Sequence, residues 1–561
     1  MFILIETAFI IFTWVLMFAT CVSIGILFQQ CFLGKHQHNF LDAFWLGWGS
    51  VVFILLLWNF FLPVNLMALL FISAIGMFSL FLNSSKIINH ARTRSLQILV
   101  ILLLVIWMAN QSARGDLPYD AGLYHLQLIK WISTCQIIPG LGNLHGRFAF
   151  NSTYFLYLAL IKSFCANFYK IGSGLLLVVA IAQSFISGAD LLRGIKQKKF
   201  YFHDIVAFTF LGPLLSQAFR YASTTSPDLP VFIIGFIISV KLSEIFFEDS
   251  DSSYLSHNIL FIIFISIVGI TIKFSLAVFA LTSIALAVGR FWMRGRGRLL
   301  LNKLLFCCLC GGIVIIFLLR GFILSGYPVY PSTFGGIKTA WQIPKEKAIN
   351  ESDWVKSWAR LPFKEPVEVL GSWQWLDPWS KRMLRGANII DFVLPAIFII
   401  INCILLMLFY KRIKTAEICK LNFLMLPACL SILSWFIFSP DPRFAGSAFF
   451  IVGISMVSFL AYVLSFESQK KLIILMSLCG LLYALTVIVG RNPSFATKRG
   501  RVNFMPASAI VQQITNSGLI IFTTKKENDQ CWDAPLPCTP YFNENLNLRD
   551  KNNICKGFYV K

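Results

Sequence analysis

Charge is what this sequence has little of. Only 13% of its 561 residues are Asp, Glu, Lys or Arg, whereas about 25% is usual in soluble domains. Hydrophobic residues make up 57% of the chain, and 55 of them are phenylalanines. A water-soluble core cannot hide so much apolar surface, but lipid can. The composition therefore excludes a soluble globular protein and predicts a polytopic integral membrane protein.

Acidic residues are the scarcer charge, with 26 Asp and Glu against 48 Lys and Arg. A basic chain can bind nucleic acid, but here the basic residues form short clusters between apolar runs. Such clusters are typical of the cytoplasmic loops of membrane proteins, so we expect no nucleic-acid partner. The first apolar run lacks a basic leader and an evident cleavage site, which favours a retained span over a signal peptide.

Apolar runs that could cross a bilayer, which takes about 20 residues, recur along the chain. They lie near residues 5–28, 43–61, 64–82, 96–110, 172–192, 204–219, 228–247, 257–272, 274–290, 303–322, 389–410, 421–438, 445–465 and 472–489. The sequence thus predicts an all-α polytopic membrane protein of about fourteen spans. No internal repeat or inverted pair of broken helices is evident, which weakens a secondary-transporter interpretation.

These runs divide the chain into six predicted parts. They are N-terminal transmembrane helices (1–110), an outer loop with two juxtamembrane helices (111–171), a transmembrane core (172–322), a Trp-rich outer loop (323–388), C-terminal transmembrane helices (389–489) and a small α/β tail (490–561). Basic clusters follow the third, fifth, ninth, eleventh and thirteenth runs, and this places them all on the cytoplasmic side. Counting 150–171 as a further span would invert the later loops. We therefore expect 124–136 and 150–171 to be helices in the outer interface.

Two carboxylates, Asp116 and Asp120, stand where the fourth run is expected to leave the membrane. A carboxylate that loses part of its hydration at the bilayer edge suits the role of a general base. Tyr124 and His125 follow, and in a helix Asp120 and Tyr124 would share a face. The alternative is a solvated loop in which Asp120 caps an interfacial helix.

Ionisable side chains also stand at the predicted outer ends of other runs. They are Arg220, Asp228, Lys273, Arg320 and Arg443. Ionisable groups at membrane depth are candidates for function, although each one alone could be a snorkelling anchor. Because cations and carboxylates gather at one predicted membrane face, we predict that they form a single site.

The two outer soluble parts offer weaker signals. Loop 323–388 contains six tryptophans, which suit interfacial anchoring of a small folded cap and, as the alternative, stacking on sugar rings. In the tail, residues 518–523 read as a strand. Cys531 and Cys538 flank a Pro-rich turn and predict a disulfide on the oxidising side of the membrane, with Cys555 as the alternative partner. Zinc is less favoured, because no His/Cys pair of suitable spacing accompanies them.

A site at the outer face of a helical bundle suits a substrate that is partly lipid. A polyprenyl-phosphate sugar donor needs an apolar groove for its tail and cations for its phosphate, and a glycan or lipid acceptor needs a base at its hydroxyl. Fixed Arg or Lys groups would stabilise the charge that develops on the departing lipid phosphate. We therefore expect membrane lipid, such a donor and such an acceptor as partners.

Three stretches carry a family resemblance. The stretch from Asp120 to Tyr124 reads Asp-Ala-Gly-Leu-Tyr and is similar to the Asp-Glu-x-x-Tyr pattern of the GT-C superfamily, membrane glycosyltransferases that use lipid-phosphate sugars. The turn ending at Asp228 resembles a second acidic turn of that superfamily, and Pro440 to Phe444 resembles its Pro-x-Arg-Tyr turn. The resemblance covers mainly residues 96–322. Ala121 replaces the second acidic residue and three runs precede the usual first span, so Asp116 could be the equivalent of the base, and a pseudoenzyme stays an alternative.

The resemblance implies a GT-C-like bundle and an inverting transfer. Asp120 would be the general base or orient the acceptor, and Asp116 would replace it or bind a metal. No cofactor is certain, and a divalent metal could be held by Asp116 or Asp228. The remaining implied roles are substrate positioning by Asp228, phosphate contact by Arg220, Lys273 and Arg443, and hydrogen bonds to the donor from Tyr124 and His125.

The strings Tyr119 to Leu126, Ser325 to Pro331 and Cys531 to Cys538 also resemble a family of bacterial multi-span membrane proteins, over nearly the whole chain. This implies a multi-pass protein of the bacterial inner membrane, with its active face exoplasmic. Two other functions stay open: a transporter or flippase of lipid-linked sugars, and a non-enzymatic assembly protein for envelope polysaccharide.

Overall fold

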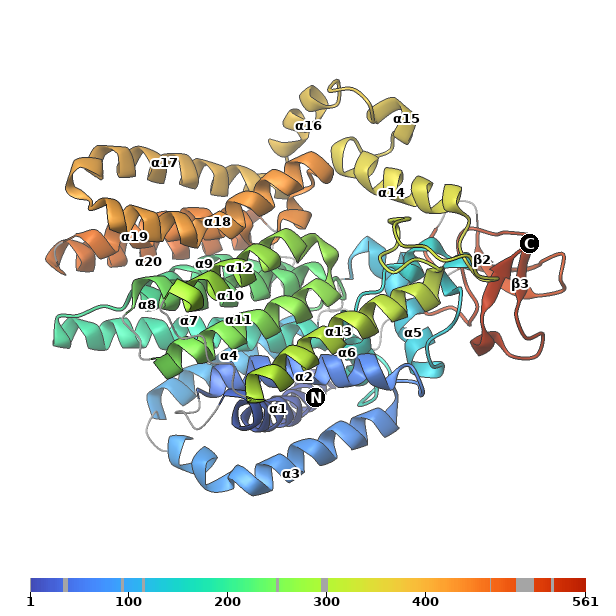
Figure 1. Cartoon of the computed structure of the whole chain (residues 1–561), viewed down its shortest axis with the longest axis horizontal. Helices are drawn as coiled ribbons and strands as arrows, with labels where there is room; N and C mark the ends of the chain where they lie inside the picture. The colour runs from blue at the N-terminus through green and yellow to red at the C-terminus, as the bar shows by residue number, and fades with distance from the viewer. Residues whose placement is uncertain are drawn as a thin grey trace.

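The computed structural model describes residues 2–33, 39–91, 95–113, 117–248, 252–293, 301–464, 466–490, 509–525 and 529–561. Most of these residues are helical, and the helices lie side by side in one bundle (Figure 1). Within the described residues, ten helices are long and apolar enough to cross a membrane. The predicted helical, multi-pass architecture is confirmed to this extent, whereas the count of fourteen spans stays a prediction.

The bundle has three groups of helices in chain order. The first contains α1 (Phe2–Phe28), α2 (Phe40–Trp58), α3 (Leu66–Ala91) and α4 (Ser95–Ser112). The second contains α7 (Gly172–Gln197), α8 (Phe202–Thr209), α9 (Leu211–Tyr221), α10 (Asp228–Phe247), α11 (Ser252–Ile272), α12 (Ala277–Met293) and α13 (Leu301–Ser325). The third contains α17 (Leu394–Phe409), α18 (Thr415–Phe438), α19 (Ala448–Val463) and α20 (Phe466–Gly490). Each predicted apolar run corresponds to one of these helices, except 204–219.

The run 204–219 forms two helices, α8 and α9, instead of the single predicted one. Pro213 explains the break, because proline lacks the N–H that would bond to the carbonyl four residues earlier and its ring crowds that carbonyl. Gly212 beside it lets α20 come close: a Cβ at this position would lie 2.8 Å from the Gly480 carbonyl oxygen. Hydropathy alone does not reveal this break.

An ionic cluster joins α2, α10 and α11 at one end of the bundle. Lys241 Nζ lies 2.9 Å from Asp42 Oδ2 and 3.1 Å from Glu244 Oε1, and His257 Nε2 lies 3.3 Å from Asp42. The Lys241, Asp42 and Glu244 side chains are at most 5% exposed. This group is called the Lys241 cluster below. It brings together the start of α2, the end of α10 and the start of α11. These three helix ends lie on the same side if successive helices cross the membrane in opposite directions.

The 111–171 segment contains two short helices, α5 (Leu126–Thr134) and α6 (Tyr154–Lys162). Nine residues extend about 14 Å, too little to cross a bilayer, so 150–171 is not a further span. Residues 154–161 are all buried. Helix α6 therefore packs inside the protein, whereas the sequence predicted an interfacial helix. Aromatic and aliphatic residues on every face of α6 explain this difference.

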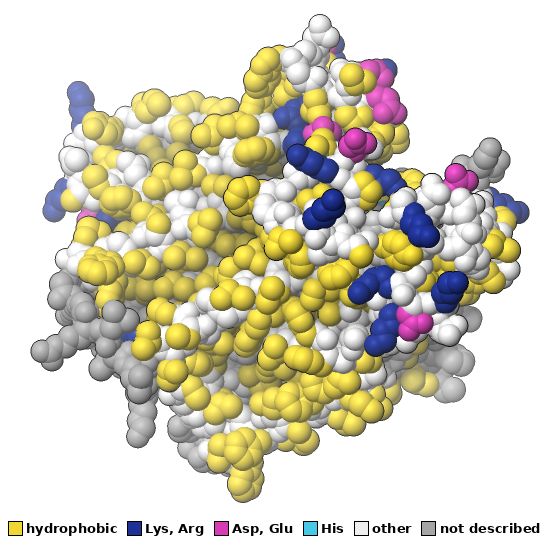
Figure 2. All heavy atoms as spheres, turned by 45° about the vertical axis from the view of Figure 1, so that its right-hand side comes forward, with side chains coloured by type: hydrophobic (Ala, Val, Ile, Leu, Met, Phe, Trp, Pro, Cys, Tyr) yellow, Lys and Arg dark blue, Asp and Glu magenta, His cyan; other side chains and the backbone are white. Residues whose placement is uncertain are grey.

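Loop 323–388 folds into α14 (Lys345–Arg360), α15 (Pro366–Val369) and α16 (Leu376–Met383). The tail forms two antiparallel pairs, β1 (Ile510–Ile514) with β2 (Ile520–Thr524) and β3 (Leu546–Leu548) with β4 (Phe558–Val560). These strands lie at the same end of the molecule as α5 (Figure 1), and the ring of Phe558 in β4 lies 5.8 Å from that of Trp131 in α5. Figure 2 shows charged side chains gathered over this end, whereas the bundle beside it is largely hydrophobic.

Candidate functional site

Asp120 lies between two arginines that come from distant parts of the chain. Its Oδ1 is 3.4 Å from Arg147 Nη1, and its Oδ2 is 3.2 Å from Arg443 Nη1. Asp120 precedes the π-helical turn Ala121–His125 but makes no side-chain capping bond to it, so the capping alternative does not describe its contacts. The Asp120 side chain is 23% exposed and that of Arg443 is 43% exposed. The pair is therefore accessible to a ligand.

A second ion pair stands at the start of α10. Asp228 pairs with Lys273, the residue that follows α11. Its other oxygen accepts a hydrogen bond of 2.8 Å from the Ser226 hydroxyl. The Lys273 ammonium also lies 4.3 Å from the centre of the Phe444 ring, next to Arg443. The second pair thus lies beside the turn that carries Arg443.

The turn at 440–444 is held by tryptophans. Trp379 Nε1 donates to the Pro440 carbonyl and Trp435 Nε1 to the Asp441 carbonyl, each at 2.6 Å. Asp441 Oδ1 accepts from the Arg443 backbone N–H at 3.3 Å. At least these two of the chain's tryptophans therefore fix the backbone that presents Arg443. The sequence predicted interfacial anchoring or sugar stacking for the tryptophans of loop 323–388, and it did not predict that one of them would hold this turn.

The charges of these two ion pairs act on one another. Burial opposes the positive charge of Arg443, but the carboxylates of Asp120, Asp441 and Asp228 raise its pKa above the ordinary value. Asp120 and Asp228 both act on the buried His125 as well. Asp120, Asp228, Lys273 and Arg443, together with Arg147, are called the Asp120 site below.

Tyr124 and His125 form the buried floor of the Asp120 site. Burial lowers the pKa of His125 to about 4, so its ring is neutral at pH 7, and Nδ1 lies 2.8 Å from the Thr225 hydroxyl. Burial and the Asp120 charge raise the pKa of Tyr124 well above its ordinary value. Both side chains are therefore neutral hydrogen-bonding groups.

Comparison with known protein families adds a classification to this geometry. Residues 8–451 match the family described as "Domain of unknown function (DUF8201)". The chain belongs to this family. All residues of the Asp120 site lie within the DUF8201 match. No curated protein and no solved structure matches the chain.

Arg147 belongs to the Asp120 site, and it was missed in the sequence analysis. It follows His145, whose Nδ1 accepts from the Arg147 backbone N–H at 3.2 Å, and its Nε lies 3.4 Å from Glu351 Oε1 on α14. Arg147 thereby connects Asp120 to the 323–388 loop. It lies inside the segment 111–171 and not at a predicted span end, so the search for charges at span ends did not find it.

Several predicted residues lie elsewhere or outside the described structure. Arg220 pairs with Asp391, with one contact of 2.7 Å, and the contacts described for the Asp120 site do not include it. Arg320 is buried and donates to Asn151 Oδ1 at 2.6 Å, which is a structural contact within the bundle. Asp116 lies outside the described residues.

A metal finds little support in the part of the chain that the structure describes. No group of three or more His, Cys, Asp and Glu residues there is arranged to hold an ion. Asp228, one of the two predicted metal ligands, has its carboxylate engaged by Lys273 and Ser226. The described residues do not fit a metal site.

The tail, which lies beyond the DUF8201 match, packs against the backbone next to Asp120. The backbone N–H of Trp532 donates to the Gly122 carbonyl at 3.0 Å. A Cβ at Gly122 would lie 2.6 Å from the Trp532 ring, so glycine is what permits this contact. Lys130 Nζ also lies 3.3 Å from Asp533 Oδ1. The tail therefore supports the turn that carries Asp120 and Tyr124.

Two disulfides fix the tail. Cys531 bonds to Cys538, as the Pro-rich turn predicted, and Cys555 bonds to Cys135 just after α5. Cys555 is thus not the alternative partner that the sequence analysis considered for this pair. Cys135 is separated from Cys555 by 420 positions in the sequence. It stands in an apolar segment, where a cysteine normally behaves as a small hydrophobic residue, so nothing in the sequence indicated that it pairs with Cys555.

Proposed function

We propose that this chain is a glycosyltransferase with a GT-C-like fold. It would move a sugar from a polyprenyl-phosphate donor to a hydroxyl of a glycan or lipid at the exoplasmic face of the bacterial inner membrane. The observation that supports this proposal is the position of Asp120 between Arg147 and Arg443, with the Asp228–Lys273 pair beside Arg443. A base and phosphate-binding cations are the two requirements of such a transfer.

The chemistry follows from an exchange of ion partners. The donor phosphate would bind Arg443, the more exposed member of its pair with Asp120, and this would release one Asp120 oxygen. Asp120 would then accept the proton of the acceptor hydroxyl as the acceptor oxygen bonds to the anomeric carbon. The bond from that carbon to the phosphate oxygen breaks, and polyprenyl phosphate leaves with the electron pair. Arg443 and Lys273 would stabilise its growing charge.

The two disulfides support the exoplasmic assignment. Disulfides persist in oxidising compartments and are rare in the cytosol. They lie in the tail and at Cys135, at the end of the protein that carries the Asp120 site. This argument is independent of the count of basic loops, and the two arguments assign the same side.

The test is sugar transfer by the purified full-length protein in liposomes that contain a labelled polyprenyl-phosphate sugar. Asp120→Asn keeps the shape of the side chain and removes the base, so we expect transfer to fall by about 10²–10⁴-fold. Asp377→Asn is the matched control, because Asp377 forms an exposed ion pair with Lys381 on α16. Undiminished transfer by a stable Asp120→Asn protein would overturn the proposal.

A flippase of lipid-linked sugars is the second candidate, and the Lys241 cluster favours it, because ionisable groups buried within spans often mark transport pathways. The same liposomes distinguish the two functions. A flippase moves the labelled donor between leaflets unchanged, whereas a transferase converts it to a product only when an acceptor is present. Movement without product would favour the flippase.

A further inference from the structure

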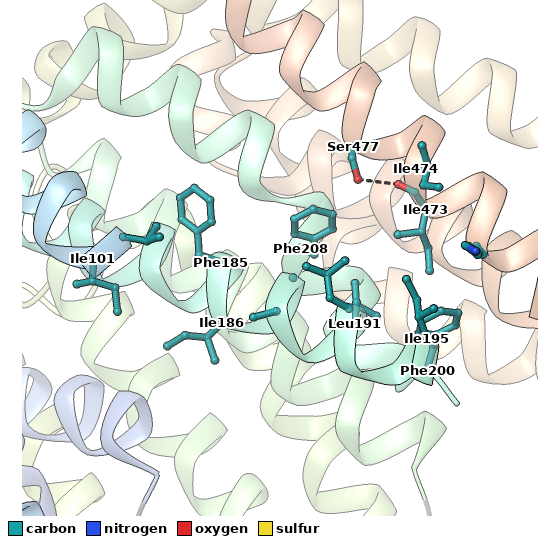
Figure 3. A pocket seen from close by; sticks show the side chains of 15 residues that line it. Ile101, Phe185, Ile186, Leu191, Ile195, Phe200, Phe208, Ile473, Ile474 and Ser477 are labelled. Carbon is teal, nitrogen blue, oxygen red and sulfur yellow. Dashed lines mark hydrogen bonds between the residues drawn. The ribbon is translucent and has the colours of Figure 1, made fainter. Parts of the chain in front are cut away.

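A cavity lies between helices of the bundle, with a volume of about 410 Å³ (Figure 3). Its wall comes from α4, α7 and α20, with Phe208 of α8 and Phe200 of the preceding connection. Apolar side chains make up nearly all of this wall. They include Ile101, Phe185, Ile186, Leu191, Ile473 and Ile474.

Only two of the lining residues carry a polar side chain, Lys470 and Ser477. The Ser477 hydroxyl donates to the Ile473 carbonyl of its own helix at 2.7 Å (Figure 3). Lys470 is therefore the one lining side chain that offers a charge to a ligand. A sugar needs several polar partners, so the wall selects an apolar ligand with one anionic group.

The cavity lies toward the basic end of these helices. On α7 its lining residues run from Phe185 to Ile195, in the half that ends at Gln197, just before Lys198 and Lys199. The 13 residues from Phe185 to Gln197 rise about 18 Å, close to the thickness of one leaflet. The Asp120 site is instead at the ends where α10 begins and α11 finishes.

We propose that this cavity binds an acyl chain of an anionic phospholipid of the cytoplasmic leaflet, with the headgroup phosphate at Lys470. A space of this kind within the membrane accepts hydrocarbon, because nearly all of its wall is apolar and offers water few hydrogen-bonding partners. An ammonium at its edge attracts a phosphate. Exposed lysines at the same end of α7 reinforce the preference for an anionic lipid. This site is separate from the Asp120 site, and the proposal does not depend on glycosyl transfer.

Photo-crosslinking of the purified full-length protein tests the site. Phosphatidylglycerol and phosphatidylcholine, each with a photoactivatable acyl chain, are compared in the same mixed micelles, and the labelled peptides are mapped. Lys470→Gln should reduce phosphatidylglycerol labelling of α7 and α20 about five-fold, which corresponds to about 1 kcal/mol for one cation near an anionic surface. Labelling by phosphatidylcholine should change little. Ala189→Phe, which fills the cavity, should reduce labelling by both lipids.

Lys471→Gln is the matched control, because Lys471 is the neighbouring lysine and does not line the cavity. Equal losses from Lys470→Gln and Lys471→Gln would overturn the proposal in favour of a diffuse basic surface. Equal labelling of the wild-type protein by the two lipids would also overturn it. Displacement by polyprenyl phosphate at lower concentrations than phosphatidylglycerol would assign the cavity to the donor instead. If Ala189→Phe fails to fold, the comparison of the two lysine variants decides the question.

Discussion

Lys241→Met removes the one lysine of the Lys241 cluster, whose carboxylates are nearly inaccessible to solvent. Asp42 and Glu244 would then share the buried site, where His257, 3.3 Å from Asp42, is a neighbour that can be positively charged. Removing one partner of a buried ion pair typically costs about 3–5 kcal/mol, because a charge is left without compensation. We expect Lys241→Met to lower the free energy of unfolding by this amount.

The measurement is unfolding of the detergent-purified protein in a titration with sodium dodecyl sulfate. Lys381→Met is the control, because Lys381 forms an ion pair of similar length, 2.7 Å from Asp377, with both side chains largely exposed. We expect it to cost at most about 1 kcal/mol. Equal costs for the two lysine variants would mean that burial does not strengthen the Lys241 contacts.

A double-variant cycle with Glu244 tests whether charge compensation explains the cost of Lys241→Met. Glu244→Gln alone disturbs the hydrogen bonds from Tyr254 and Asn258, each 2.8 Å long. In the Lys241→Met background it also removes an uncompensated charge, so its cost should be smaller there, by about 1–3 kcal/mol. Strictly additive costs would refute the charge-compensation account.

Two further predictions concern the stability of the fold in acid and the disulfide that attaches the tail. Burial lowers the pKa of His125 to about 4 and that of His145 to about 3, from 6.5, so the unfolded chain binds protons that the folded chain cannot. The free energy of unfolding should therefore fall as pH drops below about 6.5, by at most about 1.4 kcal/mol per unit for each histidine. A His125→Asn protein should lose less stability in the same pH titration, and constant wild-type stability from pH 7 to 5 would contradict this. Cys135→Ser should weaken attachment of the tail by about 2–4 kcal/mol, seen as faster tryptic release of a C-terminal fragment. Cys531→Ser opens only a local loop, and equal release from both variants would contradict this.

The helices of the bundle could be predicted because hydrocarbon imposes length and polarity on each one separately. The short break around Phe210 could not, because it depends on Pro213 and on how closely α20 approaches Gly212. Local patterns determine whether a segment is apolar. The positions at which two helices touch depend on how they pack together, and the sequence of one apolar run does not contain that information.

In the candidate site, too, some residues could be predicted from the sequence and others could not. Asp120, Asp228, Lys273 and Arg443 stand at helix ends, where a charge next to an apolar run is conspicuous, and the structure places them together. Arg147 carries no such signal, and Arg220 carries it but pairs with Asp391. A charge at a span end indicates its depth in the membrane, whereas its partner depends on the angular position of each helix in the bundle.

The contact of Trp532 with Gly122 has a consequence for the order of biogenesis. A ribosome makes Asp120 and its turn long before it makes residues 529–561, which back that turn. The Cys135–Cys555 bond can form only after Cys555 has been made and has met an oxidant. A newly inserted bundle would therefore lack the support for its Asp120 turn until residues 529–561 have been made and have packed against it.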